Sequence, residues 1–169
     1  MNADPTPSME VLLESGMGYA YALTHEMNEA EDLLQEACLA VVNAQGAWSR
    51  GYLFSAIRTR FLDRCRRRQV LTVELVGDLK SFVDTSADEV LGAGDLFEAD
   101  HESLDRALAA LSSPQREVLF LAAVEGLTAQ EIADLVDRPR GTVLSLIHRA
   151  RLKIRAFFSK ESRKGGRTP

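Results

Sequence analysis

Cysteine is scarce in this 169-residue sequence: the only two, Cys38 and Cys65, lie far apart and outside any CxxC pair. The three histidines show no metal-ligand spacing with them, so a zinc site is not expected. Long apolar runs are also missing, and the N-terminus has neither the basic flank nor the apolar core of a signal peptide. These absences predict a soluble cytoplasmic protein without membrane insertion, whose cysteines are small buried side chains rather than a disulfide.

Catalytic motifs are missing as well. The sequence contains no nucleophile elbow, no phosphate-binding glycine loop and no convincing metal cluster. We therefore expect a binding protein that is not an enzyme and that uses no metal or cofactor.

Lysine and arginine are absent from the first 49 residues, although the whole chain has a net charge of only −5. Charge alternates in four blocks: eight acids in 1–49, seven arginines in 50–69, ten acids in 70–105 and ten bases in 138–169. Each basic block is a candidate phosphate-binding surface. The acidic blocks would repel DNA, so they indicate a different partner or role.

Helical periodicity covers most of the chain. Apolar residues recur at helical spacing in residues 9–24, 29–43 and 52–68. From about 70 to 102 the periodicity fades, and glycines and acids predict a linker. The expected fold is all-α, with two small helical domains at 1–69 and 103–158, an acidic flexible linker at 70–102 and a basic disordered tail at 159–169.

The most informative motif is residues 127–154, which read as two short helices joined by a tight turn. Thr128 and Glu131 are spaced to form a capping box at the start of the first helix, and Pro139 favours its end. The second helix, from about Gly141, has one line of apolar residues that should be buried: Val143, Ile147, Ala150 and Ile154.

The opposite side of that second helix is the candidate DNA-reading face of a helix-turn-helix. Ser145, His148, Arg149 and Leu152 lie there, and the flanking bases that could hold phosphates are Arg140, Arg151, Lys153 and Arg155. The alternative is a helical hairpin with a solvated basic face.

Four segments together resemble one family. They are AEDLLQEACLAV (30–41), YLFSAIRTRFLDRCRRR (52–68), ALSSPQREVLFLAAVEGLTAQEIADLV (110–136) and GTVLSLIHRARLKIR (141–155). In this order and spacing, across an acidic linker, the chain resembles the sigma-70 family of bacterial RNA polymerase sigma factors, in its extracytoplasmic-function (ECF) group. The resemblance covers about residues 9–69 and 103–158, as a region 2-like and a region 4-like domain.

The resemblance implies that the first helices bind core RNA polymerase. The residues that match this role are Asp32, Leu33, Gln35 and Glu36. The alternative for them is an ordinary solvated helix face. The acidic linker would thread toward the active-site cleft of the polymerase, or would be a disordered tether. An anti-sigma factor is a further partner that the family implies.

The resemblance also implies two promoter-DNA surfaces. The one for the −10 element, where an unpaired base is held, comprises Arg58, Thr59, Arg60, Arg64, Arg67 and Arg68. The one for the −35 element comprises Arg140, Thr142, Leu144, Ser145, His148, Arg149 and Arg151. The alternative for the first set is a general electrostatic surface, which binds through counterion release without choosing a base.

Three positions depart from the family pattern. Thr59 stands where Asn is frequent, and Leu144 and Leu146 stand where Arg is frequent. Leu146 lies at the edge of the buried line, whereas Leu144 is more lateral and could meet a thymine methyl group or a partner protein. Two other functions therefore stay open: a helix-turn-helix regulator that acts without polymerase, and a sigma-like decoy that binds an anti-sigma protein.

Overall fold

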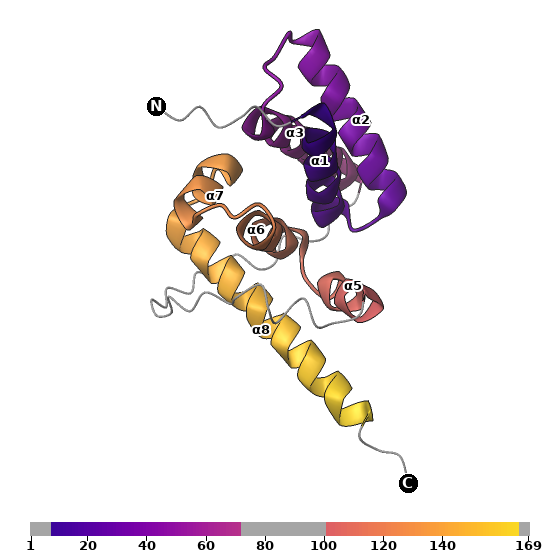
Figure 1. Ribbon diagram of the computed structural model, residues 1–169, viewed down its shortest axis with the longest axis vertical. Coiled ribbons are helices and arrows are strands. Elements are labelled where there is room, and N and C mark those ends of the chain that lie inside the picture. The colour runs from indigo at the N-terminus through magenta and orange to yellow at the C-terminus, as the bar shows by residue number, and fades with distance from the viewer. Residues whose placement is uncertain (1–7, 72–100, 166–169) are drawn as a thin grey trace. The chain divides into compact units, whose positions relative to one another are not determined.

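The computed structural model describes residues 8–71 and 101–165, and these ranges are all-α, as the sequence predicts. The chain divides into two compact units, residues 1–80 and 81–169 (Figure 1). The expected linker falls almost wholly outside the described residues. Among the described helices, none combines the length and the apolarity that a membrane span requires.

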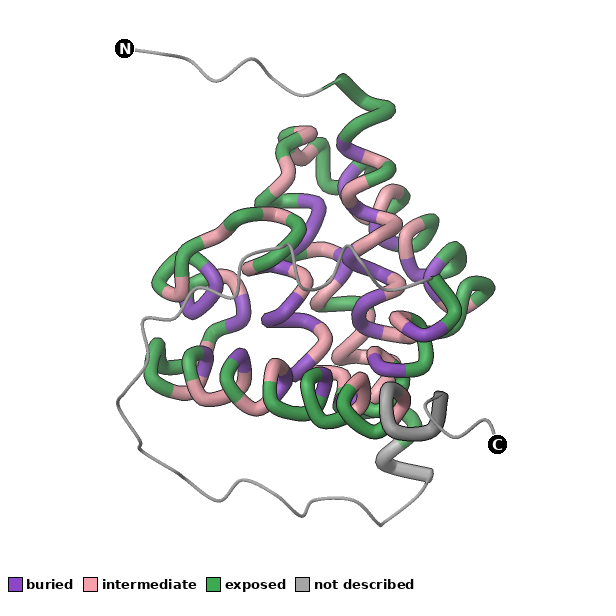
Figure 2. The backbone as a smooth tube through the Cα atoms, turned by 60° about the horizontal axis from the view of Figure 1, so that its bottom comes forward, coloured by how far each residue is buried: buried purple, intermediate pink, exposed green. Residues whose placement is uncertain are grey.

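The first unit is built from three helices, α1 (Met9–Thr24), α2 (Met27–Asn43) and α3 (Arg50–Leu71), and each packs against the other two. Their inward sides hold the buried residues in Figure 2. Tyr19 of α1 stacks on Phe54 of α3 with ring centroids 4.5 Å apart. Gly16 permits the close approach of the helices, since a Cβ there would lie 2.9 Å from Leu53 and 3.0 Å from Leu34.

The second unit contains α5 (His101–Ala109), α6 (Ser113–Ala123), α7 (Ala129–Val136) and α8 (Arg140–Gly165). Helices α5, α6 and α7 all pack against α8, which is therefore the central helix of the unit. The four residues expected on the buried line of this helix, Val143, Ile147, Ala150 and Ile154, are all buried, so that prediction is confirmed.

Two expected boundaries differ from the structure. Helix α3 is a single helix that continues to Leu71, past the expected domain end at residue 69. Helix α8 continues to Gly165, so the disordered tail expected from Ser159 was wrong as far as that residue. The helix is extended because its last turns pack on α5: the Glu161 carboxylate lies 3.0 Å from the Arg106 guanidinium, and Phe157 packs beside the same arginine. Residues 166–169 lie outside the described residues.

Candidate polymerase-binding and nucleic-acid-binding surfaces

The outer side of α2 carries three of the residues expected to bind a partner protein. Asp32, Gln35 and Glu36 are all exposed. The helix starts at an N-cap formed by Glu26, whose carboxylate accepts hydrogen bonds from the backbone N–H groups of Asn28 (3.1 Å) and Glu29 (2.7 Å). This cap satisfies donors that would otherwise be unpaired at the helix start, and it holds the register of the outer face.

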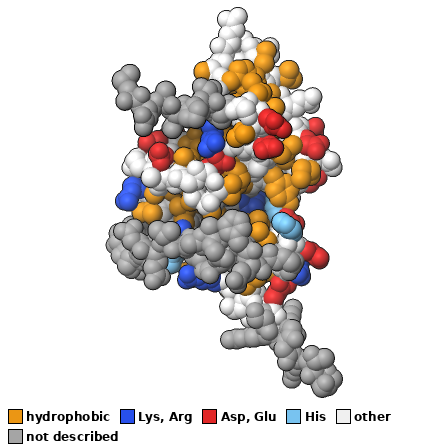
Figure 3. Space-filling view, in the orientation of Figure 1, with side chains coloured by type: hydrophobic (Ala, Val, Ile, Leu, Met, Phe, Trp, Pro, Cys, Tyr) orange, Lys and Arg blue, Asp and Glu red, His pale blue; other side chains and the backbone are white. Residues whose placement is uncertain are grey.

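Leu33, which was expected to bind polymerase, does not lie on the outer face of α2. Its side chain is 0% exposed and belongs to the core of the first unit, so it cannot contact a partner from that position. The residues on the outer face that we missed are Leu39 and Val42, which are 57% and 56% exposed. Leu39 is four residues after Gln35, so helical spacing alone could have placed it beside the polar trio. Figure 3 shows hydrophobic and acidic side chains together on the surface of this unit.

The six candidate −10 residues of α3 do not share one side of the helix. Arg64 and Arg68 point toward α2, where the Arg64 guanidinium lies 2.9 Å from the Glu36 carboxylate and the Arg68 guanidinium 2.7 Å from the Glu29 carboxylate. The hydrogen bond to Glu29 raises the pKa of Arg68. Arg60 and Thr59 instead line a surface pocket with Asp63. Arg58 is partly buried and Arg67 is exposed.

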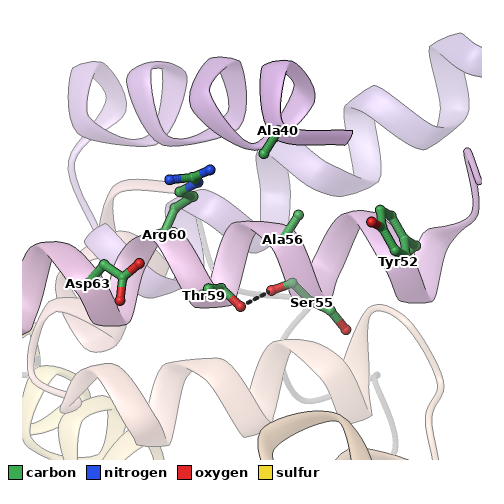
Figure 4. Close-up of a pocket in the computed structure, with 7 residues that line it drawn as sticks. All are labelled: Ala40, Tyr52, Ser55, Ala56, Thr59, Arg60 and Asp63. Atoms are coloured by element: carbon green, nitrogen blue, oxygen red, sulfur yellow. Dashed lines mark hydrogen bonds between the residues drawn. The ribbon is translucent and has the colours of Figure 1, made fainter. Parts of the chain in front are cut away.

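That pocket lies between α2 and α3 and is open to solvent. Six of its lining residues belong to α3 and one, Ala40, belongs to α2 (Figure 4): Ala40, Tyr52, Ser55, Ala56, Thr59, Arg60 and Asp63. The Thr59 hydroxyl donates a hydrogen bond of 2.8 Å to the backbone carbonyl of Ser55. The pocket thus combines two alanines, the Tyr52 ring at one end and a rim that carries both the Arg60 and the Asp63 side chains.

Tyr52 is a pocket residue that sequence reasoning missed. Its ring covers Gly46 of the α2–α3 loop, occupying the space where a Cβ at residue 46 would lie. The loop turns at Gln45, which has a left-handed φ of 51°, and the Ser49 hydroxyl then accepts a hydrogen bond from the Tyr52 backbone N–H (3.3 Å). An aromatic residue that follows a glycine loop and begins a basic helix was the available signal.

The turn between α7 and α8 forms as expected. The Thr128 hydroxyl accepts a hydrogen bond from the Glu131 N–H (3.3 Å), and the Glu131 carboxylate accepts one from the Thr128 N–H (2.8 Å). These bonds complete the predicted capping box. The hydrogen bonds that the Thr128 backbone N–H and hydroxyl donate to the Glu131 carboxylate lower its pKa. Helix α7 ends at Val136 because Asp137 adopts a left-handed conformation with φ of 51°, two residues before Pro139.

Helix α8 exposes three of its seven candidate −35 residues to solvent and the other four only in part. Arg140 and His148 are exposed and Leu144 is 42% exposed, whereas Thr142, Ser145, Arg149 and Arg151 are partly buried. Partial burial, followed by the nearby charge of Arg155, lowers the pKa of Arg151. Lys153 donates a hydrogen bond of 3.1 Å to the Gln115 side chain, which ties this base to α6. Leu152, two turns after Leu144, is 50% exposed.

The cysteines are both free thiols and partly buried, and burial raises the pKa of each. A raised pKa favours the protonated thiol over the reactive thiolate. Within the described part of the chain, no group of three or more His, Cys, Asp or Glu side chains is arranged to hold a metal ion.

Comparison with known protein families finds a matching family model for each of the two units. The model described as "Sigma-70 region 2" matches residues 15–70, and the one described as "Sigma-70, region 4" matches residues 101–154. Together the two matches span more than half of the chain; the first includes nearly all of α3 and the second includes α8 as far as residue 154.

Characterised relatives agree with this assignment. The ECF RNA polymerase sigma factor SigE of Mycolicibacterium smegmatis is 32% identical over 150 residues, which make up 85% of this chain and 57% of that protein. The ECF RNA polymerase sigma factor SigF of Caulobacter vibrioides is 31% identical over 127 residues, 72% of this chain and 66% of that protein. The chain therefore spans somewhat less than two thirds of the length of these two relatives.

A solved structure has the same fold. It is that of the sigma factor RpoE in complex with the anti-sigma factor NepR from Bartonella quintana, which aligns with a TM-score of 0.66 at 23% identity over 89% of this chain and 94% of that chain. With two family regions in the family's order, ECF relatives and this shared fold, the chain belongs to the sigma-70 family of RNA polymerase sigma factors, in its ECF group.

Proposed function

We propose that this chain is an alternative sigma factor that binds core RNA polymerase, directs it to specific promoters and initiates transcription there. The observation that carries the proposal is the pairing of two sigma regions in one chain, each with a complete core of its own and with candidate contact residues on its surface. It works by binding alone, so the protein is not an enzyme. Its place of action is the cytoplasm, where polymerase and promoters are found.

The polymerase-binding surface is the outer face of α2. We assign it Asp32, Gln35 and Glu36 as polar contacts, with Leu39 and Val42 as apolar ones. Exposed apolar residues beside polar groups are typical of the centre of a protein interface. Leu33 supports this face from below by anchoring α2 in the core and does not touch the partner.

The −10 surface is the pocket on α3. An unpaired base would lie against Tyr52 and Ala56, with its phosphate near Arg60 and with Thr59 at its polar edge. Arg67, which is exposed, would follow the backbone of the single strand. In this arrangement the aromatic ring would stack on the base, while the arginines beside it would bind the phosphates.

The −35 surface is the outer side of α8. Arg149, Ser145 and His148 would contact base edges in the major groove, while Arg140 and Arg151 would hold phosphates. Leu144 would meet a thymine methyl group. The capping box at Thr128 and Glu131 stabilises the first turn of α7, and the packing of α7 against α8 would set the angle at which α8 enters the groove.

An anti-sigma factor is proposed as a further partner, because a sigma factor of the same fold is found in complex with one. A specific observation also favours a second function, that of a decoy. Leu144 and Leu152 place two exposed leucines on α8, and such a surface suits a protein partner as well as a DNA groove.

The test is capture of purified bacterial core polymerase by the tagged chain. We expect the wild type to bind, and Gln35→Ala/Leu39→Ala to bind at least tenfold more weakly because the centre of the interface is removed. Glu14→Gln, on the exposed side of α1, is the control and should bind like the wild type. A wild type that fails to bind polymerase, or a double variant that binds equally well, would contradict the proposal.

A further inference from the structure

Lys153, which the sequence predicts as a candidate phosphate contact on α8, bonds to another helix. Its ammonium group donates a hydrogen bond of 3.1 Å to the side-chain oxygen of Gln115 on α6. Lys153 is exposed as a residue, whereas Gln115 is only 6% exposed. An exposed lysine usually keeps its charged group in water and lays its aliphatic stem on the protein. An ammonium group that turns inward to a buried amide therefore indicates a role within the unit.

Gln115 is a fixed partner for Lys153 because the start of α6 already holds it. The same side-chain oxygen accepts a hydrogen bond of 3.1 Å from the backbone N–H of Ser112, the N-cap residue of α6. That bond is part of the capping box of this helix. Lys153 thus joins α8 to the first turn of α6, across 38 positions of sequence. We define Ser112, Gln115 and Lys153 as the polar anchor.

The polar anchor lies at the edge of an apolar core. Ser112 directly follows Leu111, a member of the buried cluster of the second unit. On α8, Lys153 directly precedes Ile154 of the same cluster. Apolar contacts draw α6 and α8 together but are non-directional, so they tolerate small shifts of one helix along the other. A hydrogen bond between two defined atoms restricts such shifts, because its distance and angles must be kept.

Arg149, the proposed base contact, lies one turn before Lys153 on the same side of α8. Both residues belong to one continuous helix, so a displacement of α8 at Lys153 would also displace Arg149. Contacts of an arginine to a base edge are bidentate and need a defined geometry. A recognition residue must therefore be held closely in place by its surroundings, and the polar anchor is the directional bond nearest to it on this side of α8 among those given for the described residues.

We propose that Lys153 is a positioning residue, which holds α8 on α6 through Gln115 and so sets the place of Arg149 in the DNA groove. The proposal rests on the −35 assignment made above and deepens it, since it names a residue that acts on recognition through another residue. Breaking the anchor should lower the preference for one DNA sequence over others. It should not change the salt dependence of binding in the way that loss of a phosphate contact does.

The experiment measures fluorescence anisotropy of the full chain with two fluorescein-labelled duplexes. One is the sequence that the wild type selects from a randomised duplex library, and the other is of mixed sequence. Lys153→Met keeps an unbranched side chain and removes the ammonium group. It should lower the preference for the selected duplex about fivefold, the low end of what one base contact contributes. The charge-matched control is Lys160→Met, at an exposed position of the same helix, and it should keep the preference.

The salt dependence separates positioning from a phosphate contact. Loss of one phosphate contact would weaken binding to both duplexes alike and would flatten the plot of log affinity against log salt by about 1. Lys153→Met should instead have the same slope as Lys160→Met on each duplex. The loss of affinity should be concentrated on the selected duplex, because only there does Arg149 read a base.

Variants of Gln115 test the anchor without a change of charge. Gln115→Leu should lower the preference as much as Lys153→Met does, and the two substitutions together should lower it no further, because they break the same bond. The control for a disturbed start of α6 is Ser112→Ala, which keeps the backbone N–H and the bond to Lys153 and should keep the preference. Circular dichroism melting verifies that each variant is folded. If Gln115→Leu is not, Lys153→Met decides the question by preference and slope together.

A flatter slope for Lys153→Met than for Lys160→Met, with equal losses on both duplexes, would overturn the proposal and make Lys153 a phosphate contact. An unchanged preference in a folded Gln115→Leu would also overturn it, and a lower melting temperature alone would show a merely structural bond. If the wild type selects no sequence, the −35 assignment and the proposal both fail. An anchor-dependent preference in a chain that does not capture polymerase would support the proposal and refute the sigma function.

Discussion

Helices α3 and α8 are both rich in arginine, yet their cations are placed differently. In α8 one line of buried apolar residues faces the core, and Arg140 and His148 are exposed on another side. In α3, Arg64 and Arg68 instead pair with acids of α2, and the Arg64 side chain is only 22% exposed. The number of cations on a helix therefore does not give the number available to DNA, because a neighbouring helix can neutralise some of them.

The two units also present apolar surface differently. Leu39 and Val42 lie near acids on α2, whereas Leu144 and Leu152 lie among bases on α8. An acidic rim suits a basic protein surface and repels DNA, while a basic rim attracts phosphates. Exposed apolar residues therefore favour a basic protein partner in the first unit, whereas in the second unit they are compatible with a DNA groove as well as with a protein partner.

We expect the greatest change in stability at Leu33, the buried leucine of α2, and little change at Leu39, the exposed one. Leu33→Ala should lower the free energy of unfolding by about 2–5 kcal/mol, because it leaves a cavity at a fully buried position. Leu39→Ala should change it by less than about 0.5 kcal/mol. Urea unfolding followed by circular dichroism measures both. Similar losses for the two variants would show that α2 does not present Leu39 as an outer face.

The next prediction separates the two DNA surfaces. Arg149→Ala should weaken binding to duplex fragments that carry the −35 element by about 1–3 kcal/mol, because a base contact is lost, while capture of core polymerase stays unchanged. Arg60→Ala should instead weaken binding to the unpaired −10 strand. Fluorescence anisotropy with each DNA form measures the split, and equal losses on both forms would contradict the division between α8 and α3.

A third prediction concerns the capping box of Thr128 and Glu131 at the start of α7. Helix α2 begins instead with a single capping side chain, Glu26. Thr128→Ala should destabilise the second unit by about 1 kcal/mol, and Thr128→Ser should restore most of this. Folding lowers the pKa of Glu131, so its contribution is complete above the usual carboxyl range and is lost as pH falls through the folded pKa. Urea unfolding should thus show a smaller difference between Thr128→Ala and wild type at about pH 3 than at neutral pH. A difference independent of pH would contradict a stabilising hydrogen bond from the Thr128 hydroxyl to the Glu131 carboxylate, since the alanine variant keeps the bond from the backbone N–H.

The weakest predicted change is in duplex binding, and it tests whether Leu144 contacts a thymine methyl group in the DNA groove. Replacing a contacted thymine by deoxyuridine removes one methyl group and should weaken duplex binding by about 0.8 kcal/mol. The same DNA change should have no effect on Leu144→Ala, since the partner of the methyl is gone. A loss of equal size in wild type and variant would mean that Leu144 faces something other than thymine.

The sequence predicted α8 well because a single buried line defines its orientation. The capping box at Thr128 and Glu131 was also predictable, since its residues are three positions apart and need no other element. The bounds of α1 agree with the periodicity of residues 9–24. In each case the determining interactions are local or repeat along one helix.

The misplaced residues depend on neighbours that are distant in sequence. Leu33 and Leu34 are adjacent, and only the packing of α2 between α1 and α3 decides that Leu33 is fully buried. The ion pairs of Arg64 and Arg68 join positions 28 and 39 residues apart, which no periodicity records. The continuation of α8 past Phe158 likewise depends on Arg106 of α5.

Run-off transcription tests whether the two units act together at a promoter. Purified core polymerase would be combined with the chain on a library of genomic promoter fragments. We expect transcripts from a defined subset, weakened by Arg149→Ala and by Gln35→Ala/Leu39→Ala but not by Glu14→Gln. Polymerase that is bound without any transcript would contradict promoter recognition, and specific duplex binding without polymerase would point to an ordinary helix-turn-helix regulator.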